Sequence, residues 1–203
     1  WLNLHEFLYA LGRLDGKLQD PPTSRLGIAA GDRDRGMPQL TADERRVWSD
    51  AVAAYSRSWS VNNPVADGQA GAVVRELAAI GEAPSIDSAP LDPSLRALLA
   101  RTAPSYRRVW WPSHHEANRA WAGEMSGLLG RSGNVVRDYL ARAYAIDWPV
   151  EPRTIHVTSY ATFAGAFSLV NGGVIVVSSE DETMHGLSGL EAIFHEAMHQ
   201  WDP

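Results

Sequence analysis

The chain has 203 residues, enough for one large domain or two small ones. Its content of 45% apolar and 21% charged residues is typical of a globular protein. A net charge of −6 and the lack of a long basic run argue against a nucleic-acid-binding surface. The absence of cysteine excludes disulfides and thiolate metal ligands, so any metal must be held by histidine and carboxylate groups. No apolar run is long enough to span a membrane.

The cationic residues are 17 arginines and the single Lys17, which, together with abundant alanine, is typical of proteins from GC-rich bacterial genomes. The sequence opens at Trp1 and not at a methionine, which indicates that a segment ahead of it has been removed. A cleaved signal peptide and a trimmed chain are both consistent with this start. We expect an exported protein, periplasmic or extracellular, and the sequence leaves its oligomeric state open.

The first 150 residues carry mainly helical patterns. Apolar residues recur at helical spacing in six segments, 3–14, 41–59, 67–80, 92–103, 113–129 and 134–145. Asn3 is a candidate cap for the first helix, and Thr41 to Glu44 form a capping box for the second. Glycine, proline and aspartate in residues 15–40 indicate a long connection between these two helices. In the last segment, an apolar stripe is expected to face inward, namely Val135, Val136, Tyr139, Leu140 and Ala143.

The hydrophobic period changes after residue 150. Arg153 to Tyr160 alternates like a strand, and Gly172 to Ser179 is a second β-rich run. A capping box from Ser188 to Glu191 then starts a last helix. This order predicts an α+β fold, with a mainly helical region 1–150 followed by a strand–strand–helix region 151–203. One continuous domain is an equal alternative.

The most informative motif is the HExxH run from His195 to His199, with Glu196 directly after the first histidine. Positions four apart lie on one face of a helix, so His195 and His199 can present two imidazole nitrogens to one metal ion. Glu196 points to the flank, where a metal-bound water would lie; zinc lowers the pKa of such a water, and a neighbouring carboxylate can take its proton. Apolar residues surround most of this helix, which predicts that it is buried. The alternative is a core helix whose two histidines bond to neighbouring carbonyls.

The last fifty residues resemble the catalytic part of zincin-type metallopeptidases, in a gluzincin-like arrangement. In that superfamily an edge strand precedes the HExxH helix and pairs with an extended substrate. The resemblance implies that Gly172 to Ser179 is this edge strand, with an ordinary core strand as the alternative. It also implies that His195 and His199 bind Zn²⁺, and that Glu196 is the general base that later passes the proton to the leaving amine. The implied partner is a peptide or protein substrate.

The chain departs from the family pattern at the third metal ligand. Catalytic zinc takes three protein ligands and keeps one position open, and both main zincin branches supply the third ligand downstream of the motif. This chain ends at Pro203, four residues beyond His199. Three interpretations stay open: the third ligand lies beyond residue 203, it comes from within the chain, or the metal site is incomplete. The internal candidates are His185, Glu180, Glu182, His114, His115 and Asp202, of which Asp202 is also a candidate for orienting a ligand histidine.

These patterns predict a zinc-dependent hydrolase, a metallopeptidase that uses a zinc-activated water with Glu196 as its general base. Tyr160 is an additional candidate for polarising a carbonyl oxygen. Two other classes stay open. One is a catalytically inactive zincin-like scaffold that acts as a peptide or cell-surface binding module. The other is a purely structural helical protein in which the motif is accidental.

Overall fold

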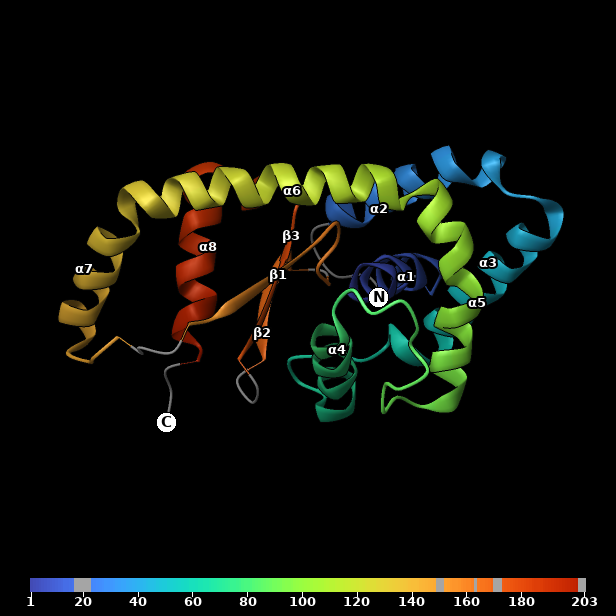
Figure 1. Cartoon of the computed structure of the whole chain (residues 1–203), viewed down its shortest axis with the longest axis horizontal. Coiled ribbons are helices and arrows are strands. Elements are labelled where there is room, and N and C mark those ends of the chain that lie inside the picture. Colours follow the sequence, from blue (N-terminus) through green and yellow to red (C-terminus); the bar gives the residue numbers. More distant parts are fainter. Residues whose placement is uncertain (17–22, 149–151, 163, 170–172, 201–203) are drawn as a thin grey trace.

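We describe the fold from a computed structural model, for residues 1–16, 23–148, 152–162, 164–169 and 173–200. Within these residues the chain is mainly helical and carries one small sheet, which confirms the predicted α+β class (Figure 1). The helices are α1 (Leu2–Asp15), α2 (Thr23–Gly36), α3 (Ala42–Ala54), α4 (Gly68–Ile80), α5 (Pro93–Val109), α6 (Trp111–Leu128), α7 (Asn134–Tyr144) and α8 (Gly186–Met198). The strands are β1 (Thr154–Thr158), β2 (Ala166–Leu169) and β3 (Val174–Ser178). Short helical turns lie at Met37–Gln39, Tyr55–Trp59, Leu129–Gly133 and Glu182–Met184.

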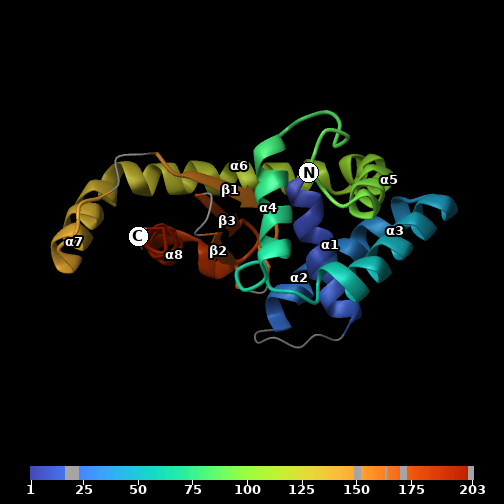
Figure 2. The same cartoon turned by 90° about the horizontal axis from the view of Figure 1, so that it is seen from below.

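Helix α1 is the centre of the N-terminal helical layer. Eleven of its fourteen residues are buried, including polar ones, so other elements surround it on every side. It packs against α2, α3, α4, α5 and β1, and Figure 2 shows it among these helices. The ring of Phe7 stacks on Tyr160 at a centroid distance of 5.3 Å and meets Trp110 edge-on at 5.7 Å. These contacts join the helical layer to the segment that follows β1.

The sheet has helices on both of its faces. Its strand order is β1-β3-β2, with β3 parallel to β1 and antiparallel to β2. Successive side chains of a strand point to opposite faces, so Val174 and Val176 belong to the core around α1. Ile175 and Val177 pack instead in a second core with residues of α6 and α8. All five residues of β3 are buried for this reason.

The position of β3 corrects one expectation from the sequence. The run from Gly172 to Ser179 was expected to be an edge strand, but β3 lies in the centre of the described sheet. The alternative, an ordinary core strand, is the one that the structure confirms. A strand buried on both faces reads as a continuous apolar run, which is the pattern of Val174 to Val177. The edges of the described sheet are β1 and the antiparallel β2.

Three expectations for the helices were wrong. Residues 23–36, expected within a connection, form α2, because Leu26 and Ala29 bury themselves against the core around α1. Helix α5 does not end before Pro104 but continues to Val109, since its next buried residues include Tyr106. The stripe of α7 does not face inward, because Val135 is 72% exposed and Tyr139 is 64% exposed.

Of the predicted caps, one is correct and two are wrong. Thr41 and Glu44 form the predicted capping box at the start of α3. Asn3 does not cap α1, because that helix already begins at Leu2. The box from Ser188 to Glu191 is not used, because α8 already begins at Gly186. The division at residue 150 stays a prediction. Among the helices that the structure describes, none is long and apolar enough to cross a membrane.

Candidate metal centre

The start of α8 is held by α6 through a carboxylate clamp. Glu124 of α6 accepts a hydrogen bond from the Gly186 amide at 2.7 Å and bonds the Nδ1 of His185 at 2.7 Å. The Nε2 of His185 lies 3.0 Å from the carbonyl oxygen of Ser179. Burial opposes the charge of His185, but the bonds to Glu124 and Ser179 outweigh it and raise the pKa of His185. The clamp therefore favours a charged His185 and fixes where α8 begins.

The body of α8 is packed between α6 and the sheet. The indole of Trp121 donates to the carbonyl of Met184 at 2.7 Å, just before the helix. Gly189 lies so close to this turn that an added Cβ would clash with the carbonyl oxygen of Met184. Ile193 and Ala197 continue the same face into the core that α6 and the sheet share. Figure 1 shows the result, with α8 between α7 and the sheet and α6 running across one end of it.

His195 and His199 lie at the other end of α8, on an exposed side, so the prediction that this helix is buried around most of its surface was correct only in part. Their Nε2 atoms are 3.0 Å apart, with ring centroids at 4.6 Å and the rings nearly perpendicular at 89°. Two imidazole nitrogens on one tetrahedral zinc, at about 2.0–2.1 Å each, are separated by about 3.3 Å. The observed pair therefore needs only a small side-chain adjustment to occupy two corners of such a site.

Glu196 lies on the flank of α8 beside the two histidines. Its side chain is buried, with 9% of the residue exposed, and no hydrogen bond or ion pair joins it to another described residue. Gln200, one turn further along the same flank, donates to the carbonyl of Val174 at 3.2 Å. This flank therefore faces the beginning of β3.

The candidates for a third ligand that precede α8 do not reach the histidine pair. His185, Glu180 and Glu182 lie before its first turn, whereas His195 is on its last turns. Nine residues of helix separate Gly186 from His195, a rise of about 14 Å. Both ring nitrogens of His185 are also engaged in the clamp.

The two histidines of α6 are occupied elsewhere. His114 is buried, with its Nδ1 3.0 Å from the hydroxyl of Tyr106 and its Nε2 3.2 Å from the carboxylate of Asp32. His115 packs against Trp111 at a ring distance of 5.1 Å. Within the described residues no three His, Asp or Glu side chains come together to hold a metal ion. Asp202 lies outside the described residues.

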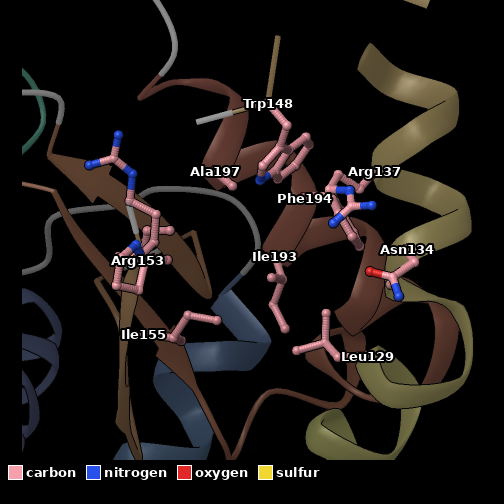
Figure 3. Close-up of a pocket in the computed structure, with 12 residues that line it drawn as sticks. Leu129, Asn134, Arg137, Trp148, Arg153, Ile155, Ile193, Phe194 and Ala197 are labelled. Carbon is pink, nitrogen blue, oxygen red and sulfur yellow. The ribbon is translucent and has the colours of Figure 1, made fainter. Parts of the chain in front are cut away.

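A cavity of about 620 Å³ lies on the face of α8 that carries Ile193, Phe194 and Ala197, away from His195 and His199. The ring of Trp148 meets Phe194 edge-on at 5.5 Å on one of its walls. Figure 3 shows the side chains around this cavity. Its lining comes from α7, α8, β1, β3 and the segments next to them. The lining residues include Leu129, Asn134, Arg137, Ile155, Ile175, Ile193, Phe194 and Ala197. Neither histidine of the motif lines it, so the cavity is separate from the candidate metal centre.

Tyr160 does not lie where the sequence suggested. Its hydroxyl donates to Asp32 within the core, and the residue is 5% exposed. It is therefore part of the packing between α2 and the segment after β1 and not a group that polarises a substrate.

Two residues that support the site, Glu124 and Gln200, were not found from the sequence. Glu124 acts on a segment 61 residues away in the chain, and no local pattern signals such a contact. Gln200 follows the motif directly, and its position four residues after Glu196 was the only available signal.

Comparison of the chain with protein-family models, with curated proteins and with solved structures gave no match. The function of the site is therefore argued from its own geometry and chemistry.

Proposed function

We propose that the protein is a zinc-dependent hydrolase of the zincin type that cleaves peptide bonds. The observation that carries this proposal is the exposed pair of His195 and His199, with Nε2 atoms 3.0 Å apart and Glu196 beside them. The two exposed rings contact only each other among the described side chains, through the Nε2 pair, so no core contact uses their nitrogens. The pair faces away from the core that fixes α8, which leaves both rings accessible to a metal ion.

The donor set suits zinc. Neutral imidazole nitrogens and carboxylate oxygens are ordinary zinc ligands, and the chain has no cysteine to compete with them. His195 and His199 would hold the ion, and a third ligand from outside the described residues would complete the site. When bound, zinc supplies a Lewis acid that polarises a carbonyl group and makes a coordinated water more acidic.

The role of Glu196 in this proposal is proton transfer. No described donor occupies its carboxylate, so the carboxylate is available to accept a proton from a water molecule beside it. A general base positioned by a packed helix contributes about 10²–10⁴ in rate. The same carboxylate then returns the proton to the leaving amine. Glu124, Trp121 and Gly189 act indirectly, because they fix the helix that carries the base.

In this proposal the strand that pairs with an extended substrate is β2, and not β3 as expected from the sequence. β2 is the antiparallel edge of the described sheet, and it packs directly against α8. An extended peptide placed beside β2 would run past the helix that carries the motif, which is the arrangement that β-augmentation requires. β1, at the other edge, has no comparable contact with α8.

The decisive experiment compares Glu196→Gln with the unchanged protein, both in the complete natural chain. We expect Glu196→Gln to retain bound zinc by elemental analysis and to lose peptide hydrolysis by about 10²–10⁴. Glu191→Gln is the matched control, since Glu191 is an exposed carboxylate on the same helix. His195→Ala is expected to lose the zinc.

The outcomes separate the proposal from its alternatives. Unchanged hydrolysis in Glu196→Gln would contradict the mechanism. Zinc that survives replacement of both histidines would contradict the metal centre. A protein that binds peptides without cleaving them would instead be the inactive zincin-like scaffold, which is favoured by the lack of a third ligand among the described residues.

A further inference from the structure

A groove of about 710 Å³ lies away from the histidine pair, on the side of the sheet that carries β1. We refer to it as the α6–β1 groove. Its floor is apolar, with Leu4, Leu77 and Ala103 from the helical layer. Its polar and aromatic lining is supplied by Trp1, Asn3, Glu82, Tyr106, Arg107, Trp111, His115, Asn118, Arg119 and His156. Among the lining residues, Glu82 is the single acid.

Two arginines give the groove a positive charge. Arg107 and Arg119 are both exposed, and neither forms an ion pair or a hydrogen bond with a described carboxylate. The guanidinium of Arg107 lies 4.6 Å from the ring centre of Trp1, which holds it at one wall. The whole chain has a net charge of −6, so unpaired cations gathered in one groove indicate an anionic ligand.

The second wall is a stripe along α6. Trp111, His115 and Arg119 follow one another at intervals of four residues, so their side chains lie on one face of the helix. The rings of Trp111 and His115 are in contact, with centroids 5.1 Å apart. This wall offers flat apolar surface at one end and a guanidinium at the other. It therefore suits a ligand that alternates apolar and anionic groups.

The third wall is the outer edge of β1, which Asn3 occupies only in part. The side chain of Asn3 donates to the carbonyl of Val157 at 3.3 Å and accepts from the amide of Ser159 at 3.1 Å, as a neighbouring strand would. The carbonyl of Thr158 accepts from Ser179, so Thr158 faces β3 and its neighbours face outward. The Val157 amide and the Ile155 carbonyl thus point outward without a partner among the described residues.

We propose that the α6–β1 groove binds an extended peptide with acidic side chains. Its backbone adds to the free part of β1, beyond the two groups that Asn3 already satisfies. Its carboxylates bond to Arg107 and Arg119, and an apolar side chain packs between Trp1 and Trp111. This site uses none of the groups of the metal centre, so the groove proposal and the hydrolase proposal are tested independently.

The test is a binding titration with a synthetic peptide in which glutamate alternates with valine, monitored by tryptophan fluorescence in the presence of a metal chelator. The chelator suppresses any zinc-dependent cleavage, so only binding is measured. We expect Arg107→Glu and Arg119→Glu each to weaken binding by about tenfold or more, as loss of a charge-assisted hydrogen bond does. Arg101→Glu is the matched control, because it makes the same charge change on α5 at an exposed residue outside the groove.

Two changes to the peptide test the remaining parts of the proposal. Replacing its glutamates by lysines is expected to abolish binding. Methylating its backbone nitrogens, with the carboxylates kept, is expected to weaken binding by about tenfold or more, because strand pairing is then blocked. Thermal unfolding checks that the arginine variants stay folded, and a glutamine substitution at the same position replaces any variant that does not.

Several results would overturn the proposal. Equal binding of the lysine peptide would contradict the charge argument, and equal binding of the methylated peptide would contradict pairing with β1. Binding of an acidic oligosaccharide with the same arginine dependence, but of no peptide, would assign the groove to a different class of ligand.

Discussion

The buried carboxyl group of Glu6 gives the sharpest prediction about stability. Glu6 lies in the central helix α1, is 1% exposed, and accepts a hydrogen bond from the amide of Thr162 at 3.0 Å. Burial raises its pKa from 4.5 to about 8, although the bond from Thr162 acts in the opposite direction. The folded protein therefore keeps Glu6 protonated at neutral pH, where the unfolded chain has already released this proton.

The sign of the effect follows from this difference in bound protons. Between pH 4.5 and about 8 the folded state holds one more proton at Glu6 than the unfolded state, so stability falls as the pH rises. Each pH unit of the window costs up to about 1.4 kcal/mol, so the loss across the window is several kcal/mol. Above the window both states are ionised and the penalty stays constant.

Glu6→Gln tests this reasoning, because the amide keeps an acceptor for Thr162 and cannot ionise. Urea unfolding of both proteins from about pH 5 to about pH 9 gives their free energies of unfolding. We expect the variant to match the natural protein near pH 5 and to exceed it by several kcal/mol near pH 9. Other titrating groups are common to both proteins and cancel in the difference.

Glu116→Gln is the control, since Glu116 is exposed on α6 and its replacement should leave the pH dependence unchanged. A difference between Glu6→Gln and the natural protein that does not vary with pH would refute the assignment of a protonated Glu6. A difference that grows towards acid pH would show that the pKa of Glu6 is lowered in the folded state and not raised.

Three further outcomes are expected. Burial lowers the pKa of His114 from 6.5 to about 4, so the folded state keeps it neutral and stability is lost as the pH falls through this range. In His114→Asn the free energy of unfolding should therefore decrease less steeply as the pH is lowered. Glu124→Gln should speed amide hydrogen exchange in the first turn of α8, and the effect should shrink at alkaline pH, where His185 loses its charge in the natural protein. Gly189→Ala should lower the melting temperature, at a cost of about 1–3 kcal/mol, because the new Cβ meets the carbonyl oxygen of Met184; an unchanged melting temperature would show that this helix start is not tightly packed.

The parts of the fold that were predicted correctly depend on residues close in the chain. The capping box of Thr41 and Glu44 acts within one turn, so the sequence alone determines it. Helix α2 depends instead on contacts of Leu26 and Ala29 with α1, which only the folded chain provides. The continuation of α5 past Pro104 has a similar origin, since burial of Tyr106 and its neighbours outweighs the hydrogen bond that proline removes.

The order of the strands was beyond the reach of local patterns for a related reason. The run from Val174 to Val177 is apolar throughout, which indicates burial on both faces but does not specify the neighbouring strands. Its antiparallel partner β2 is only four residues long and carries no strict alternation, so it was not predicted. The edge position of Gly172 to Ser179 was taken from the zincin resemblance, and no local pattern in the chain specified it.

The histidine pair could be predicted because helix geometry and helix packing act on the same residues. Each residue of a helix turns by about 100°, so the face of Ile193 and Ala197 lies nearly opposite to that of His195. Once that apolar face packs against α6 and the sheet, His195 and His199 must point away from the core. Their spacing then sets the 3.0 Å approach of the two nitrogens. The spacing of the histidines does not specify the position of α8 along its axis. The clamp from Glu124 fixes this position and so determines how far the pair extends beyond the sheet.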